Sequence, residues 1–167
     1  ADGRAALAFL VTMVAAAAGG LSWMLAEWLM RGAPTLLGLL SGLVGGLVAI
    51  TPAAGFVQVG GAALIGLIAG VACYWGATWL KRKLGADDSL DVFGVHGVGG
   101  IVGSLLTAVF ADKAISGANA SLLIQLAAVA AVAVYSALAT AVLLWLIRLV
   151  LPLRVSEAHE QQGLDVS

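Results

Sequence analysis

Five long apolar runs divide the chain, and short polar breaks separate them. A bilayer core about 30 Å thick is crossed by a helix of roughly 20 apolar residues, at a rise of about 1.5 Å per residue. The runs therefore predict five transmembrane helices, at about 5–30, 35–57, 60–80, 91–110 and 120–151. We expect an all-α membrane protein with a transmembrane helical domain over 1–153 and a cytoplasmic polar tail over 154–167.

Composition agrees with a membrane protein and narrows its partners. Hydrophobic residues make up 62% of the chain and charged residues 10%, whereas soluble domains carry about 45–50% and about 25%. Too little polar surface remains to cover a water-soluble globule. The 8 Lys and Arg against 9 Asp and Glu leave no basic excess for a phosphate backbone, which excludes nucleic acid as the main partner. Membrane lipid is the expected surrounding.

The basic residues are unevenly divided between the two ends of the predicted helices. One side of the membrane would hold six of them, in the first loop, the third loop and the C-terminal end: Arg31, Lys81, Arg82, Lys83, Arg148 and Arg154. The other side would hold Arg4 and Lys113. Because basic residues concentrate in cytoplasmic loops, we expect the N-terminus outside and the C-terminus in the cytoplasm of a cell (inner) membrane.

Glycines recur at intervals of four residues within several of the predicted spans. Gly38, Gly42 and Gly46 form such a series, and Gly66 with Gly70 form another. Small residues at this spacing let membrane helices approach each other closely. We expect tight helix packing here and assign these glycines no ligand.

His96 is the residue most in need of explanation, because it lies five residues inside the fourth predicted span. An ionisable group at that depth needs a partner, and it faces either the bundle interior or a cavity. One interpretation is a structural histidine that bonds a neighbouring helix. The other is a proton relay, since imidazole can pass a proton between its two nitrogens. The flanking glycines leave room for a small substrate or a second imidazole.

Three acids precede this helix, and they suit a structural role better than a cation site. Asp91 lies where an N-cap carboxylate would accept backbone N–H groups, and we expect at least one of Asp87, Asp88 and Asp91 to cap the helix. The adjacent cluster Lys81-Arg82-Lys83 would neutralise the three acids. Cys73 lies in an apolar run, and no Cys, His or carboxylate set has metal-ligand spacing. No nucleophile–base pair or phosphate-binding loop is evident. We expect no metal, no cofactor and no enzyme.

The run Asp87-Asp88-Ser-Leu-Asp91-Val-Phe93-Gly-Val-His96-Gly-Val-Gly-Gly100 resembles the signature of the ammonium transporter family (Amt/Mep, with the related Rhesus proteins). Other segments resemble the family in the same order along the chain. They are Glu27-Trp28, the run from Gly46 to Gly55, Gly60-Gly61, Leu153-Arg154-Val155 and Gly163-Leu164-Asp165. The resemblance covers nearly the whole chain and is far more specific than any single motif.

The resemblance implies an eleven-helix transporter, trimeric in the membrane, with two inverted five-helix repeats, a final helix and one hydrophobic pore per subunit. This chain resembles spans seven to eleven, the second repeat plus the final helix. The family's pore holds two hydrogen-bonded histidines, and His96 matches the second. Val92, one turn earlier, matches a residue of the cytoplasmic half of the pore. Asp88 and Asp91 match acids of the family motif with a structural or helix-capping role.

The first pore histidine, the aromatic gate and span six have no counterpart in this sequence, and the first residue is Ala rather than Met. We therefore expect ammonium or ammonia transport with this chain as the C-terminal half, the N-terminal half being in the same polypeptide or in a separate chain. The alternative is a non-conducting ammonium-sensing or assembly module whose tail binds a PII signalling protein. A generic helical bundle would leave His96 without a role.

Overall fold

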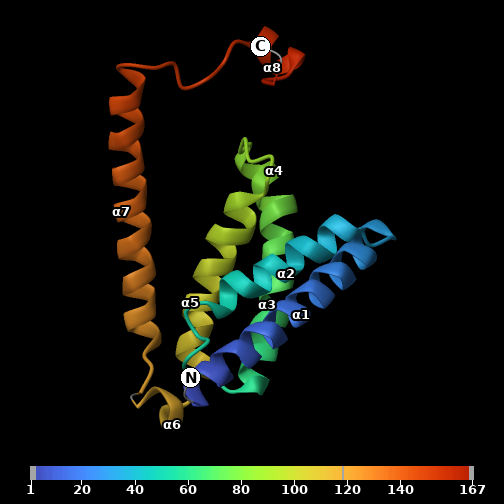
Figure 1. The fold of residues 1–167 in the computed structure, drawn as a ribbon, viewed down its shortest axis with the longest axis vertical. Helices are drawn as coiled ribbons and strands as arrows, with labels where there is room; N and C mark the ends of the chain where they lie inside the picture. Colours follow the sequence, from blue (N-terminus) through green and yellow to red (C-terminus); the bar gives the residue numbers. More distant parts are fainter. Residues whose placement is uncertain (1–2, 118, 166–167) are drawn as a thin grey trace. The chain divides into compact units, whose positions relative to one another are not determined.

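The computed structural model describes residues 3–117 and 119–165, and helices dominate them. The helices are α1 (Gly3–Arg31), α2 (Leu36–Ile50), α3 (Val59–Trp75), η1 (Gly76–Leu80), α4 (Lys81–Leu84), η2 (Phe93–Gly97), α5 (Val98–Phe110), α6 (Lys113–Ser116), α7 (Leu122–Arg148) and α8 (Glu157–Gln162). Both η1 and η2 are π-helical. Two compact units are present, residues 1–126 and 127–167 (Figure 1). The expected all-α class is confirmed.

Among the described residues, four continuous helices are long and apolar enough to cross a membrane: Gly3–Arg31, Val59–Leu84, Phe93–Phe110 and Leu122–Arg148. Helix α2 has 15 residues and is shorter than the predicted range 35–57. It ends at Ile50 because Pro52 lacks an N–H for the helix ladder. The chain then turns tightly, with Ala54 N donating to Ile50 O at 2.8 Å and Phe56 N donating to Ala53 O at 2.8 Å.

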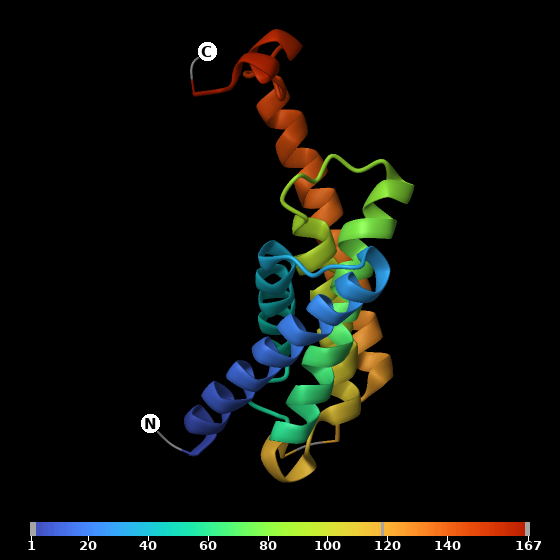
Figure 2. The same cartoon turned by 90° about the vertical axis from the view of Figure 1, so that its right-hand side faces the viewer.

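Helix α1 packs against both α2 and α3, and it crosses α3 obliquely (Figures 1 and 2). The contacts are made backbone to backbone. A Cβ added at Gly46 would lie 2.3 Å from the carbonyl oxygen of Ala15, and one at Gly66 would lie 2.3 Å from the same atom. Glycine is required at these two positions because a methyl group would force the helices apart.

The core of the first unit consists of two clusters of buried side chains. The first joins α1, α2, α3 and the turn after α2, and its residues are Val11, Ala15, Ala49, Ile50, Ala53, Val57, Ala62, Ile65 and Ala69. The second contains Trp23, Cys73, Tyr74, Ala77 and Val95. Because Ala77 belongs to η1 and Val95 to η2, the second cluster supports the segment that carries His96.

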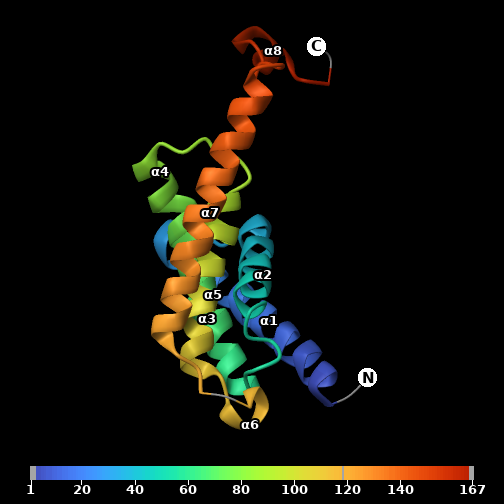
Figure 3. The same cartoon turned by 90° about the vertical axis from the view of Figure 1, so that its left-hand side faces the viewer.

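A group of hydrogen bonds lies at the end of this unit where α5 is followed by α6, which is at the bottom of Figure 3. Asp112 N donates to Phe56 O at 2.8 Å, and the Gln58 side chain donates to the Asp112 carboxylate. The same carboxylate accepts from Ala114 N at 2.8 Å, so it also caps α6. These hydrogen bonds link the turn after α2 to the end of α5.

The second unit contains most of α7 and the short tail helix α8. Helix α7 is 27 residues long, with Arg148 in its last turn. Ser156 is the N-cap of α8, and its hydroxyl accepts a hydrogen bond from His159 N at 3.3 Å. Serine is a favoured N-cap because its side chain satisfies an N–H that the helix leaves unpaired.

Candidate functional site

His96 lies in η2, on the exposed face of that segment. Val92, four residues earlier, is 53% exposed, and Phe93 is also exposed. Gly94 and Val95 are buried and hold the segment against the bundle. The two predicted pore residues, His96 and Val92, are therefore both exposed at this end of the helix. In the part of the chain that the structure describes, no helix of the first unit covers them.

Two of the acids before η2 have different structural roles, one as a helix cap and the other in an ion pair. Asp88 accepts hydrogen bonds from Val92 N at 2.8 Å and from Phe93 N at 2.9 Å, so its carboxylate caps the helix. The Asp91 carboxylate accepts instead from Lys81 Nζ, at 2.7 Å. Asp91 has φ 54°, a left-handed conformation that Asp tolerates better than most residues. This turn directs the Asp91 side chain toward Lys81 rather than toward the N–H groups of its own helix.

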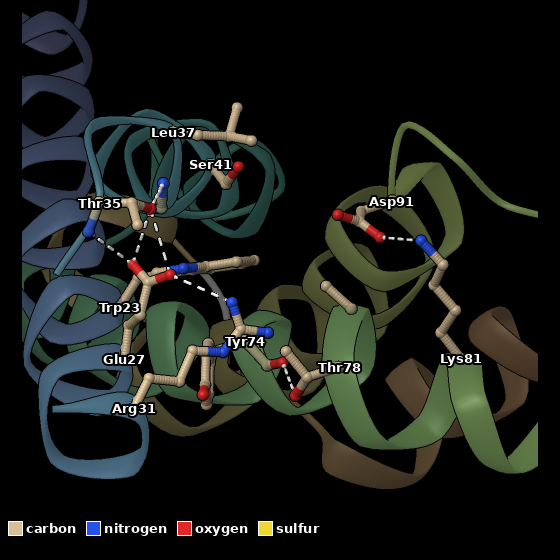
Figure 4. A pocket seen from close by; sticks show the side chains of 12 residues that line it. Trp23, Glu27, Arg31, Thr35, Leu37, Ser41, Tyr74, Thr78, Lys81 and Asp91 are labelled. Carbon is tan, nitrogen blue, oxygen red and sulfur yellow. Dashed lines mark hydrogen bonds and ion pairs between the residues drawn. The ribbon is translucent and has the colours of Figure 1, made fainter. Parts of the chain in front are cut away.

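A cavity of about 360 Å³ opens between the ends of α1, α2 and the α3–η1 segment (Figure 4). Its walls carry two acid–base pairs, Glu27 with Arg31 and Asp91 with Lys81. The remaining lining residues are Trp23, Thr35, Leu37, Gly38, Ser41, Tyr74, Ala77 and Thr78. Each acid of this cavity is bound to a neighbouring base, so the cavity wall carries balanced charge.

Glu27 is the most enclosed acid of the chain that the structure describes, at 3% exposure. Its carboxylate accepts from Thr35 N at 3.0 Å and from Thr35 Oγ1 at 3.0 and 3.1 Å. The Thr35 hydroxyl in turn accepts from Gly38 N at 2.9 Å and is the N-cap of α2. Arg31 Nη1 lies 3.4 Å from Glu27 Oε1. The carboxylate therefore fastens the end of α1 to the start of α2.

Of the residues that the sequence singled out, one lies in this cavity, and other lining residues were not predicted. Asp91 reaches the cavity, whereas His96, Val92 and Asp88 do not line it. The network around Thr35 was not foreseen, although two signals were available. Glu27 and Arg31 have the i, i+4 spacing of a helical ion pair, and a threonine that directly follows a proline and precedes an apolar run is a candidate N-cap.

The fold and the site define a multi-pass helical membrane protein with a histidine on an open helix face. The family follows from comparison: the chain matches the Ammonium Transporter Family over residues 1–167 and belongs to it. The ammonium transporter of Bacillus subtilis (strain 168) is 45% identical over 175 residues, which covers 99% of this chain and 43% of the relative. That of Aquifex aeolicus (strain VF5) is 50% identical over 167 residues, covering 96% and 40%.

Solved structures share the fold. Saccharomyces cerevisiae Mep2 aligns with a TM-score of 0.83 at 36% identity, covering 95% of this chain and 39% of that one. A structure described as a sensor Amt protein aligns with a TM-score of 0.90 at 32% identity, covering 99% and 42%. The chain thus spans about two fifths of the length of the relatives it matches. The resemblance drawn from the motifs is confirmed.

Proposed function

We propose that this chain supplies the C-terminal half of an ammonium transporter, with the N-terminal half in the same polypeptide or in a separate chain. The observation that carries the proposal is the family match over residues 1–167. Two fifths of the relatives' length is covered, in keeping with a half-transporter. Here "the assembled transporter" means this sequence together with that N-terminal half. It is a homotrimer in the inner membrane, with its C-terminus in the cytoplasm, and it is a transporter rather than an enzyme.

The mechanism uses the one property that separates ammonium from potassium, an ion of similar size and equal charge. Ammonium can lose a proton. In an apolar pore lined by residues such as Val92, a bare cation would bear a large desolvation penalty, whereas neutral ammonia would bear a much smaller one. Ammonium is deprotonated near the outer mouth, ammonia crosses past the histidine pair, and the proton is relayed or returned separately. The exposed position of His96 supports this role, because a partner imidazole from the other half could reach it.

The test replaces His96 with alanine in the assembled transporter, reconstituted in lipid vesicles. Loss of the imidazole should lower the ammonium transport rate by at least about tenfold or let potassium compete, because general acid–base groups contribute on the order of a hundredfold or more. His159→Ala is the matched control, since that histidine belongs to the tail helix α8. Unchanged rate and selectivity in His96→Ala would return His96 to a structural role.

The assembly itself is tested by the mass of the native polypeptide taken from the membrane. The 167 residues of this chain have a mass of 16.7 kDa. A native mass of about 40 kDa would place the N-terminal half in the same polypeptide, because this chain of 16.7 kDa spans about two fifths of its relatives' length. A native mass near 16.7 kDa would place the N-terminal half in a separate chain, or would mean that the pore is absent and that the sensing function leads. Mass spectrometry of the intact protein distinguishes the two.

A second function, an ammonium-sensing or assembly module, is favoured by one comparison. The solved structure described as a sensor Amt protein covers 99% of this chain. In this case the tail would bind a PII signalling protein and the assembly would carry no current. Capture of a purified PII protein on the assembled protein, together with absence of ammonium-dependent current, would favour sensing. Current without capture would favour transport.

A further inference from the structure

His96 and Gly103 should share a helix face, yet they do not. Residues seven apart in a regular α-helix differ by only about 20° around the axis. Gly103 is buried so deeply that a Cβ there would lie 2.1 Å from the carbonyl oxygen of Ala49. His96, one heptad earlier, is exposed. A regular helix would therefore turn the imidazole toward the packed bundle, and something between the two residues rotates it outward.

The π-helical segment η2 supplies that rotation. It spans Phe93–Gly97 and contains His96, and Val98 N donates to Phe93 O across five residues rather than four. One additional residue in a turn rotates the preceding side chains by about 100°, the angle per residue of a helix with 3.6 residues per turn. Single π-turns within α-helices occur frequently at functional sites. Here the π-turn separates an exposed His96 from the buried stripe of α5.

A second π-helical segment packs against the first at backbone distance. In η1, Lys81 N donates to Gly76 O, again across five residues. A Cβ added at Gly94 would lie 2.6 Å from Ala77 N, and one added at Gly76 would lie 3.0 Å from Gly94 O. The backbones of the two widened turns therefore approach each other closely at Gly76 and Gly94. Because the two backbones are in contact, neither π-turn can rewind into a regular α-helix without moving the other.

Cys73 reinforces the turn that carries His96. Its thiol is fully buried and donates to the carbonyl oxygen of Val95, the residue before His96, at 3.5 Å between Sγ and O. The Val95 carbonyl also accepts from Val98 N. The thiol also lies close to α5, because a Cβ added at Gly99 would lie 3.0 Å from Sγ. One side chain of α3 thus contacts both η2 and α5 at their junction.

We propose that Cys73 is a positioning residue for His96. With the contact between η1 and η2, it holds the π-turn that directs the imidazole out of this bundle and toward the half-pore supplied by the rest of the assembled transporter. The inference rests on the proposed function and deepens it. Cys73 contacts no substrate; it acts through the backbone of η2.

The experiment compares three variants of the assembled transporter in lipid vesicles. Cys73→Ala removes the thiol donor, Cys73→Ser keeps a donor, and Ile65→Val is the control. The control removes one heavy atom from another fully buried side chain of α3, in the cluster remote from η2. The readout is the ratio of ammonium to methylammonium transport rates. We expect at least about a threefold change in Cys73→Ala, recovery toward the parent ratio in Cys73→Ser, and no change in Ile65→Val.

A double variant shows whether Cys73 acts through His96. If it does, Cys73→Ala should leave the ratio unchanged in a His96→Ala background, since the energies of coupled residues do not add. The proposal is overturned if Cys73→Ala gives the same ratio as Ile65→Val, or if its effect persists without the imidazole. If instead the proposed function is wrong, His96→Ala itself would leave the transport rate and the ratio unchanged. Protein recovered as a single species by gel filtration ensures that the rates compare folded molecules.

Discussion

Glu27 shows how one buried carboxylate organises the polar end of this bundle. Both of its oxygens accept from Thr35, whose own hydroxyl caps α2. Glu27→Ala would remove the hydrogen bonds that Thr35 N and Thr35 Oγ1 donate to this carboxylate, and hydrogen bonds to charged groups contribute about 1.5–3 kcal/mol. Glu27→Gln keeps one oxygen acceptor and should cost less.

The thermal midpoint in detergent should therefore fall in the order parent, Glu27→Gln, Glu27→Ala. Glu157→Ala is a suitable control because that residue lies in the exposed tail helix α8. Equal midpoints for Glu27→Ala and the control would contradict the assigned role of Glu27 as the fastening between α1 and α2.

Asp112 gives a pH-dependent prediction outside the membrane-spanning segments. The hydrogen bond from the Gln58 side chain, and then the one from Ala114 N, lower the pKa of Asp112 below its ordinary value. A lowered pKa favours the ionised form in the folded protein, so the stabilisation is present above pH about 4 and is lost as the pH falls through the folded pKa. Acid should therefore weaken the link between the turn after α2 and the end of α5.

Gln58→Ala should raise the pKa of Asp112 toward its ordinary value, because the largest cause of the shift is removed. The midpoint can be followed by carboxyl carbon NMR of protein labelled at aspartate. Gln161→Ala, in the tail helix, should leave the midpoint where it is in the parent. An unchanged midpoint in Gln58→Ala would show that the two side chains do not interact in solution.

The residues at the start of η2 show the limit of sequence reasoning at this scale. The cluster of acids next to a basic run indicated helix capping and neutralisation, and the structure contains a cap at Asp88 and an ion pair at Asp91. Spacing suited Asp91 to the cap, but its positive φ directs the carboxylate to Lys81. A backbone conformation of this kind is set by the loop as a whole and has no separate sequence signal.

At the scale of elements, the crossing of η1 and η2 depends on glycine. A Cβ at Gly94 would lie 2.6 Å from Ala77 N and 2.7 Å from Ala77 Cα, both backbone atoms that cannot rotate away. Gly94→Ala should therefore destabilise the protein by about 1–3 kcal/mol, the usual range for overpacking. Gly60→Ala is the control, since a Cβ there meets nothing within 4 Å.

Thermal unfolding in detergent, followed by intrinsic tryptophan fluorescence, compares the two variants with the parent. We expect a lower midpoint for Gly94→Ala alone. If Gly94→Ala were as stable as Gly60→Ala, the two π-turns would not be in the close contact described here.

The helices themselves were largely predictable, because length and hydropathy determine which segments cross a bilayer. The exception is α2, which ends at Ile50 although its apolar run continues. The two π-turns were not foreseen either. A π-turn is stabilised by what packs around it, and the Gly76–Gly94 contact joins residues from different helices. Local sequence signals carry little information of that kind.

At the scale of the whole molecule, the distribution of basic residues predicts how the chain lies in the membrane. Ala114 and Ala158 lie at exposed positions, in α6 and α8 respectively. The positive-inside rule predicts that α6 lies outside and α8 in the cytoplasm. A cysteine at position 114 should react with a membrane-impermeant thiol reagent in intact cells, whereas one at position 158 should react only after permeabilisation.

Native Cys73 provides a low background for this experiment because it is buried. Ala114→Cys and Ala158→Cys also serve as controls for each other, since they differ only in the expected side. Labelling of Ala158→Cys in intact cells, with protection of Ala114→Cys, would reverse the orientation.

The sequence by itself determined the membrane class, the all-α fold and the family, because apolar length, glycine spacing and the motif around His96 are properties of consecutive residues. It also singled out His96 and Val92. Only the tertiary structure decided which way those side chains face. The π-turn, the contact of Gly94 with η1 and the thiol of Cys73 together rotate His96 out of the bundle. These contacts join distant parts of the chain, and the free energy that fixes them arises only when the helices pack.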